Sequence, residues 1–129
     1  MNREEENTFK ELYQSAVEAG KNAVMRTNVR PMVVYQRSNP LDDKSEIVYA
    51  SIVEDGVCGF ANIIVKPANS KFSKWLLKNG YATHAYGGGV SIHVSEYNQS
   101  LQRKEAYAYA FADTLRKANI NAYVESRLD

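Results

Sequence analysis

Apolar residues recur at helical spacing in three stretches of this chain and at alternating spacing between them. The first helical stretch carries an apolar stripe from Phe9 to Val24. Asn2 can cap its first turn, and the glutamates at positions 4–6 suit the positive end of the helix dipole. The pattern predicts an N-terminal helix over residues 1–28, with one face buried against the rest of the protein.

The next segments favour β-strands. Residues 29–37 and 45–53 are rich in Val, Ile and Tyr, and the turn-forming sequence "SNPLDDK" lies between them. A further strand-like run, "FANIIVKP", follows after "EDGVCG". These features predict a β-meander after the N-terminal helix, in which residues 29–56 form a β-hairpin extension.

From residue 57 onward, strands and helices alternate. A short helix "KFSKWLLKNG", capped by Asn69 or Ser70, leads to the strand "YATHAY", and three glycines separate it from the strand "VSIHVSEY". A longer helix begins at Ser100 and is followed by the strand "INAYVESRL". This order predicts one α+β domain over residues 1–129, with a ferredoxin-like βαββαβ core over residues 57–129. Both core helices should lie on one face of an antiparallel sheet.

The two halves of this core also share apolar positions. Phe72 and Leu76 of the short helix match Phe111 and Leu115 of the long helix at one constant offset. The match is consistent with a duplicated β-α-β unit.

Side chains of a strand alternate between the two faces of its sheet. Val90, Ile92 and Val94 should therefore meet the helices, whereas Ser91, His93 and Ser95 should lie on the far face. The last strand divides in the same way, with Tyr123, Glu125 and Arg127 on the far face. We expect this polar and aromatic face to be solvated, covered by the N-terminal helix and strands, buried in a subunit contact, or used as a ligand platform.

Charge and composition exclude some classes of function. The 129 residues include 16 basic and 15 acidic side chains, with no basic stripe of the kind that general nucleic-acid binding requires. No apolar run approaches the roughly 20 residues of a membrane-spanning helix, so we expect no membrane association. The single cysteine, Cys58, cannot form an intrachain disulfide and is expected to be a small buried thiol.

The segment "HAYGGGVSIHV" contains the residues closest to a catalytic motif. Gly87, Gly88 and Gly89 join two strands, which favours a hairpin turn over a phosphate-binding loop. His93-Val94-Ser95 fits half of the two-histidine phosphoesterase signature, but Tyr86 occupies the Ser/Thr position after His84. The sequence therefore predicts no catalytic residues, no metal ligands and no cofactor. A two-histidine phosphoesterase stays as an alternative.

Nine tyrosines are present, and several arginines lie in elements that carry them. An aromatic ring can stack on a nucleobase while a guanidinium pairs with a phosphate, although the same residues also suit an oligomer interface. The predicted ligand-binding residues are Tyr86, Ser91, His93, Arg103, Arg116, Tyr123 and Arg127.

The segments "KFSKWLLKNGY" and "QSLQRKEAYAYAFADTLRKANINAYVESRLD" resemble small accessory proteins of bacteriophages. Among these, the chain resembles the anti-Thoeris sponge proteins. The resemblance implies a homo-oligomer in the host cytoplasm that sequesters a cyclic-nucleotide-like immune signal without catalysis. The alternative is an inhibitor that binds a host defence enzyme through the same surface.

Overall fold

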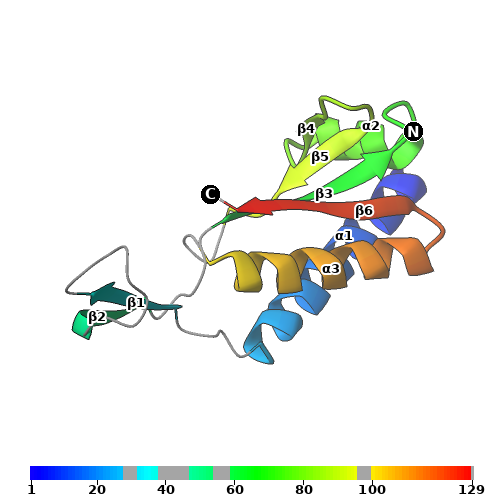
Figure 1. Ribbon diagram of the computed structural model, residues 1–129. Coiled ribbons are helices and arrows are strands. Elements are labelled where there is room, and N and C mark those ends of the chain that lie inside the picture. Colours follow the sequence, from blue (N-terminus) through cyan, green and yellow to red (C-terminus); the bar gives the residue numbers. More distant parts are fainter. Residues whose placement is uncertain (28–31, 38–46, 54–58, 96–99, 129) are drawn as a thin grey trace.

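The computed structural model describes residues 1–27, 32–37, 47–53, 59–95 and 100–128 (Figure 1). Cys58 lies outside these residues. The fold is α+β, as predicted. Its elements, in chain order, are α1 (Arg3–Met25), β1 (Met32–Arg37), β2 (Ile47–Val53), β3 (Gly59–Lys66), α2 (Lys71–Lys78), β4 (Thr83–His84), β5 (Val90–His93), α3 (Leu101–Lys117) and β6 (Asn121–Leu128).

Each helix begins at a side-chain cap. Asn2 Oδ1 accepts a hydrogen bond from the backbone N–H of Glu5 at 2.8 Å, and Ser70 Oγ accepts one from Ser73 at 3.1 Å. Ser100 Oγ does the same for the N–H of Arg103 at 3.4 Å. These caps satisfy backbone donors that the first helical turn leaves unpaired, and they confirm the three predicted helix starts.

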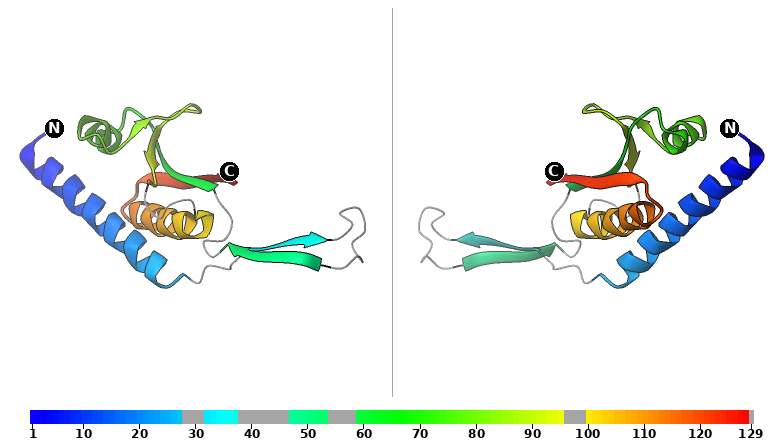
Figure 2. Two further views of the ribbon diagram at one scale, coloured as in Figure 1. Left: turned by 90° about the vertical axis from the view of Figure 1, so that its left-hand side faces the viewer. Right: turned by 90° about the vertical axis from the view of Figure 1, so that its right-hand side faces the viewer.

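The described strands form two separate antiparallel sheets. β1 pairs only with β2, and the second sheet has the order β4-β5-β3-β6. The predicted meander therefore ends at β2, because β3 pairs with β5 and β6 instead of continuing the first hairpin. Figure 2 shows the β1–β2 hairpin extending away from the four-stranded sheet and the helices.

Helices α2 and α3 supply the apolar layer beneath the four-stranded sheet. α3 packs on β3 and β6, and Phe72 and Leu76 of α2 are fully buried in the same core. Phe111 and Leu115, their predicted counterparts on α3, are buried as well. Ala61, Ile63 and Val65 of β3, with Val90 and Ile92 of β5, form the sheet side of this core.

Helix α1 lies on the outer side of α2 and α3 (Figure 2). Near its N-terminus, Phe9 contacts Phe72 edge-to-face at 5.4 Å, and Tyr13 stacks on Tyr81 at 4.2 Å. Further along, Gly20 packs against the ring of Tyr107 on α3. Because α1 packs on the helices, it does not cover the other face of the sheet. None of the described helices has both the length and the apolar character needed to cross a membrane.

Candidate functional site

The face of the sheet opposite α2 and α3 carries the polar and aromatic side chains that the alternation predicted. We call it the open face. The pairing registers place Asn62 opposite both His93 and Glu125, and Phe60 opposite Arg127. Directly opposite residues lie on the same face of an antiparallel sheet. The open face of these three strands is made of Phe60, Asn62, Ile64, Lys66, Ser91, His93, Asn121, Tyr123, Glu125 and Arg127.

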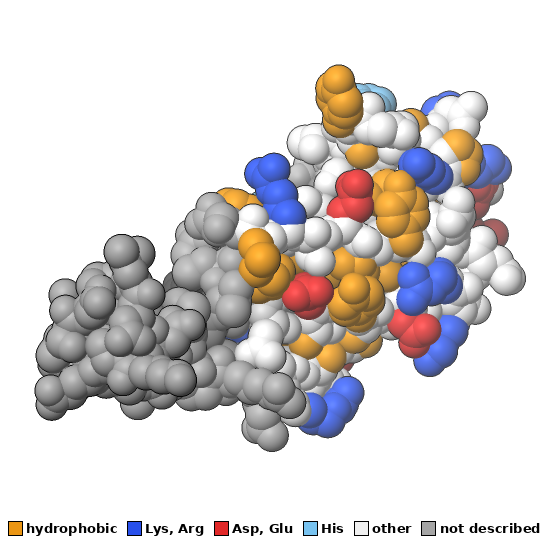
Figure 3. Space-filling view, in the orientation of Figure 1, with side chains coloured by type: hydrophobic (Ala, Val, Ile, Leu, Met, Phe, Trp, Pro, Cys, Tyr) orange, Lys and Arg blue, Asp and Glu red, His pale blue; other side chains and the backbone are white. Residues whose placement is uncertain are grey.

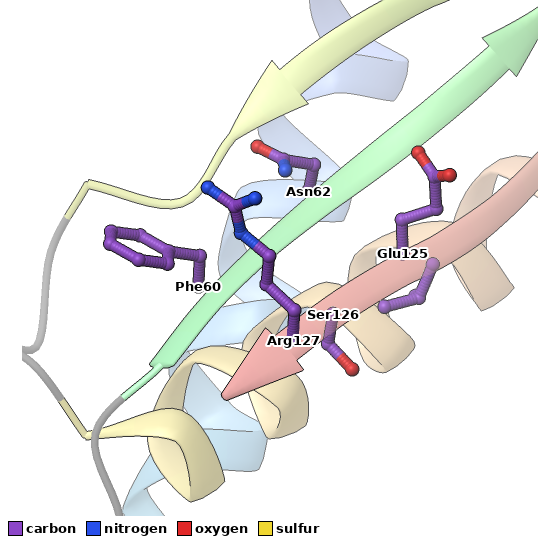
Figure 4. A pocket seen from close by; sticks show the side chains of 6 residues that line it. Phe60, Asn62, Glu125, Ser126 and Arg127 are labelled. Atoms are coloured by element: carbon purple, nitrogen blue, oxygen red, sulfur yellow. The ribbon is translucent and has the colours of Figure 1, made fainter. Parts of the chain in front are cut away.

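A hollow of about 600 Å³ lies on this face where β3 meets β6 (Figure 4). We call it the open-face hollow. Arg127 extends over β3 toward Asn62 and Phe60, and Glu125 rises from the same side of β6, whereas Ser126 points the other way. The hollow is lined by Phe60, Asn62, Val124, Glu125, Ser126 and Arg127. It thus combines an aromatic ring, an amide, a carboxylate and a guanidinium within one volume.

Two cations lie close to the ring of Phe60. The guanidinium carbon of Arg127 is 5.2 Å from the ring centroid, and Nζ of Lys104 is 5.3 Å from it. Lys104 comes from α3, is only 3% exposed, and donates to the carbonyl of Gly59 at 3.3 Å. Arg127 forms no ion pair within the described residues. This end of the hollow therefore carries positive charge that no described carboxylate neutralises by direct contact.

His93 and Asn62 join the hollow to the neighbouring strand. Nδ1 of His93 lies 2.7 Å from Oδ1 of Asn62. Because a carboxamide oxygen only accepts, this contact assigns the proton to Nδ1 and leaves Nε2 for a further partner. The pair holds the imidazole in a defined orientation beside Phe60, whose ring centroid is 6.5 Å from that of His93.

A second, smaller hollow of about 250 Å³ lies on the β5 side of His93. Its lining includes Thr83, Ser91, His93 and Ser95. Ser91 and Tyr123 flank Ile64 on the two neighbouring strands, and the ammonium of Lys66 lies 5.3 Å from the Tyr123 ring. Of the predicted site residues, the structure therefore brings Ser91, His93, Tyr123 and Arg127 onto one face.

The three remaining predicted site residues lie elsewhere. Arg103 and Arg116 belong to α3, in the helical layer on the other side of the sheet. Arg116 donates to the carbonyl of Ala122 at 2.8 Å, a contact that ties the end of α3 to β6. Tyr86 lies in the turn between β4 and β5 and is fully exposed.

The glycines of this turn have a structural role. Gly88 and Gly89 adopt positive φ angles of 99° and 77° between two antiparallel strands, which confirms the predicted hairpin. A Cβ atom on Gly89 would lie 2.5 Å from the carbonyl oxygen of Val65. The absence of a side chain at Gly89 therefore allows the turn to lie directly against the backbone of β3.

The two histidines do not converge. His84 pairs with Val90, which faces the helices, whereas His93 pairs with Asn62 on the open face. Two imidazoles on opposite faces cannot act on one phosphate as general acid and base. Within the described part of the chain, no cluster of three or more His, Cys, Asp or Glu side chains is placed to hold a metal ion.

Phe60, Asn62 and Lys104 were not predicted as site residues, although the sequence carries a signal for each. Alternation along "FANIIVK" places Phe60 and Asn62 on one face and Ala61, Ile63 and Val65 on the other. Lys104 lies three residues after Leu101 and four before Ala108, on the apolar stripe of α3. A lysine at such a position marks a buried cation.

Figure 3 shows the charge and hydrophobicity of one side of the molecule. Among the residues that are coloured by type in this view, hydrophobic side chains are exposed in patches that lie among charged ones. Comparison of the chain with protein-family models, with curated proteins and with solved structures finds no match.

Proposed function

We propose that this protein binds a small anionic ligand in the open-face hollow and does not transform it. The observation that carries the proposal is the guanidinium of Arg127, which lies over the Phe60 ring without a carboxylate partner in the described chain. A guanidinium in this position offers its N–H donors to a phosphate or carboxylate, and its flat surface to a ring.

The other groups of the hollow narrow the class of ligand. Asn62 offers an amide next to Arg127, and His93, which lies opposite Asn62 beside the hollow, leaves its Nε2 for a ligand. Glu125 is a hydrogen-bond acceptor that would repel a second anion, so it favours a ligand with hydroxyl or amino donors. A nucleotide-derived molecule has all three features: an anionic group, a flat ring and donors. The immune signal implied by the resemblance to the phage proteins belongs to this class, and binding without turnover would sequester it.

Titration with AMP and cyclic AMP tests this proposal. Backbone amide NMR signals of β3, β5 and β6 should shift in the wild-type protein, and the same titration should leave Arg127→Ala almost unchanged. Lys74→Ala, an exposed change on α2 away from the open face, should respond as the wild type does. Shifts confined to α1 and α2, or equal shifts in Arg127→Ala, would contradict the proposal. Conversion of cyclic AMP to AMP during the titration would favour the phosphoesterase alternative.

A second candidate function is inhibition of a host protein by direct contact. The observation that favours it is Tyr86, which is fully exposed at the tip of the β4–β5 hairpin. Exposed tyrosines are frequent anchors of protein interfaces. Capture of a host defence enzyme by the wild type, with loss of capture in Tyr86→Ala and no effect of Arg127→Ala, would favour inhibition over ligand binding.

A further inference from the structure

Strand β6 is an edge of the four-stranded sheet, and its eight residues carry no described strand on their outer side (Figure 1). A long edge strand with unpaired backbone groups is a ready template for pairing with another strand. The side chains of residues 125–128, at the C-terminal end of the strand, are exposed on both faces of the sheet, and Leu128 is 65% exposed. This half of β6 is therefore accessible along its edge and on both faces.

Two hydrogen bonds show which backbone groups of β6 point outward. The Val94 N–H donates to the carbonyl of Ala61, so the backbone groups of Ala61 point toward β5 and away from β6. Ser126, the partner of Ala61 in β6, therefore has its own N–H and C=O on the outer edge. Arg116 donates to the carbonyl of Ala122, so this carbonyl is not used for pairing with β3. Ala122 lies four residues before Ser126, and this contact therefore independently supports the same set of outward-pointing residues. By alternation, the outward residues are Ala122, Val124, Ser126 and Leu128.

We propose that two copies of the chain associate by antiparallel pairing of β6 with β6 about a twofold axis at Ser126. In this register Val124 and Leu128 of each copy pair with the partner's Leu128 and the partner's Val124, and the outward N–H and C=O groups of all three residues are satisfied. The pairing also covers Leu128, and it joins the two four-stranded sheets into one continuous sheet.

Charge selects this register over its neighbours. With the axis at Ser126, Glu125 lies opposite the partner's Arg127, and Arg127 lies opposite the partner's Glu125. An axis at Glu125 or at Arg127 would place like charges directly opposite each other, which is destabilising. An axis at Val124 would require the Ala122 carbonyl, which already accepts from Arg116.

The pairing also bears on the open-face hollow, because Glu125 and Arg127 both line it. The hollows of the two copies would adjoin across the axis, where each Arg127 lies opposite the partner's Glu125. A guanidinium has five N–H donors, so such a contact leaves donors of Arg127 for a ligand. The dimer does not rest on the proposed ligand. It follows from the unpaired edge of β6, from the backbone groups that point outward there, and from the charges of Glu125 and Arg127.

A charge exchange tests the dimer. Light scattering during size-exclusion chromatography, from micromolar to near-millimolar protein, should show the wild type rising from 14.5 kDa toward twice that mass. The paired stretch is short and should bury less surface than the ~1,200 Å² at the lower end of standard interfaces. The dimer should therefore be weak, and its fraction should depend on protein concentration. Glu125→Arg and Arg127→Glu should each weaken dimerisation about tenfold, because each places like charges in opposition twice. The double variant, Glu125→Arg with Arg127→Glu, should restore it.

Two controls keep this test decisive. Glu11→Arg makes the same charge change as Glu125→Arg at an exposed site on α1, and its dimerisation should equal that of the wild type. Ser126→Pro removes an outward N–H that the β3–β6 ladder does not use, and it should give a folded monomer. A wild type that stays at 14.5 kDa over the whole range, or single charge variants that the double exchange does not rescue, would overturn the inference.

Discussion

Nδ1 of His93 lies 2.7 Å from Oδ1 of Asn62, across the pairing between β5 and β3. The two residues come from segments that are 31 positions apart in the chain. Their contact orients the imidazole on the open face and links the two hollows that flank it.

Asn62→Ala removes the acceptor of the His93 Nδ1 proton and should weaken binding of AMP by about fivefold. The reason is that a typical hydrogen bond contributes about 1 kcal/mol and that the imidazole loses its defined orientation. Isothermal titration calorimetry of the variant and the wild type measures the change. Ser15→Ala, an exposed substitution on α1, should leave the affinity unchanged. Equal affinities of Asn62→Ala and the wild type would exclude a positioning role for this pair.

Substitutions of Arg127 can show whether ligand binding needs the planar shape of the guanidinium or only its positive charge. Arg127→Lys keeps the positive charge but loses the flat fork that lies over Phe60. We expect Arg127→Lys to bind AMP about tenfold more weakly than the wild type and Arg127→Ala to bind it more weakly still. Competition binding with a fluorescent AMP analogue would rank the three proteins. If the lysine variant bound as tightly as the wild type, charge alone would suffice and the stacked guanidinium would be unnecessary.

The local pattern of the chain was enough to predict which side chains of β5 and β6 share the open face, although Arg127 is the one predicted residue that lines the open-face hollow. Alternation in β5 and β6 placed Ser91, His93, Tyr123 and Arg127 on the face away from the helices, as the registers show. Helix capping by Asn2, Ser70 and Ser100 could also be predicted from the sequence, because capping depends on residues within one helical turn.

Other features depend on contacts that the local pattern does not contain. The sequence allowed the β3 segment either to continue the β1–β2 meander or to join the sheet of the C-terminal core, and only the fold shows that it pairs with β5 and β6. Strand order is decided by packing between distant segments, here by the apolar side of β3 against α3. Arg103 and Arg116 were predicted as ligand-binding from their proximity to tyrosines in sequence, whereas the fold places them on the helical side.

Gly20 should be sensitive to the smallest substitution. A Cβ atom at this position would lie 2.6 Å from Cδ2 of Tyr107, whose side chain is buried between α1 and α3. Alanine normally stabilises a helix interior by up to about 1 kcal/mol relative to glycine. Here we expect overpacking to prevail, so that Gly20→Ala lowers the free energy of unfolding by about 1–2 kcal/mol.

Urea unfolding followed by the fluorescence of Trp75, the single tryptophan, measures this effect. Ser15→Ala, on the exposed side of the same helix, is the matched control and should be neutral or slightly stabilising. A stabilised Gly20→Ala protein would show that α1 and α3 are not in close contact at this crossing.

The contact between α1 and α2 should weaken in acid. Hydrogen bonding to Lys71 lowers the pKa of Glu5, and hydrogen bonding to Lys78 lowers the pKa of Glu6. The ion pairs are 3.0 Å and 2.8 Å long. Since both pKa values are lower in the folded protein than in the unfolded chain, the pairs stabilise the fold above the ordinary glutamate value of 4.5. This contribution disappears as the pH falls through the folded-state values.

A double variant, Lys71→Met with Lys78→Met, should therefore lose less stability between pH 7 and pH 3 than the wild type does. Urea midpoints at the two pH values give the comparison. The difference should be small because the lysines are largely exposed and the glutamates are about one-third exposed. Lys74→Met, an exposed change on the same helix, should keep the acid sensitivity of the wild type. Identical acid sensitivity of the double variant and the wild type would rule out these pairs as its source.

The most direct test of the proposed function is the mass spectrum of material released by heating the protein after purification from defence-active cells. Binding in the open-face hollow predicts an intact anionic molecule with a ring system, released from the wild type and from Lys74→Ala but strongly depleted in Arg127→Ala. A wild-type protein that releases no such molecule, or a molecule recovered in equal amount from Arg127→Ala, would contradict the account.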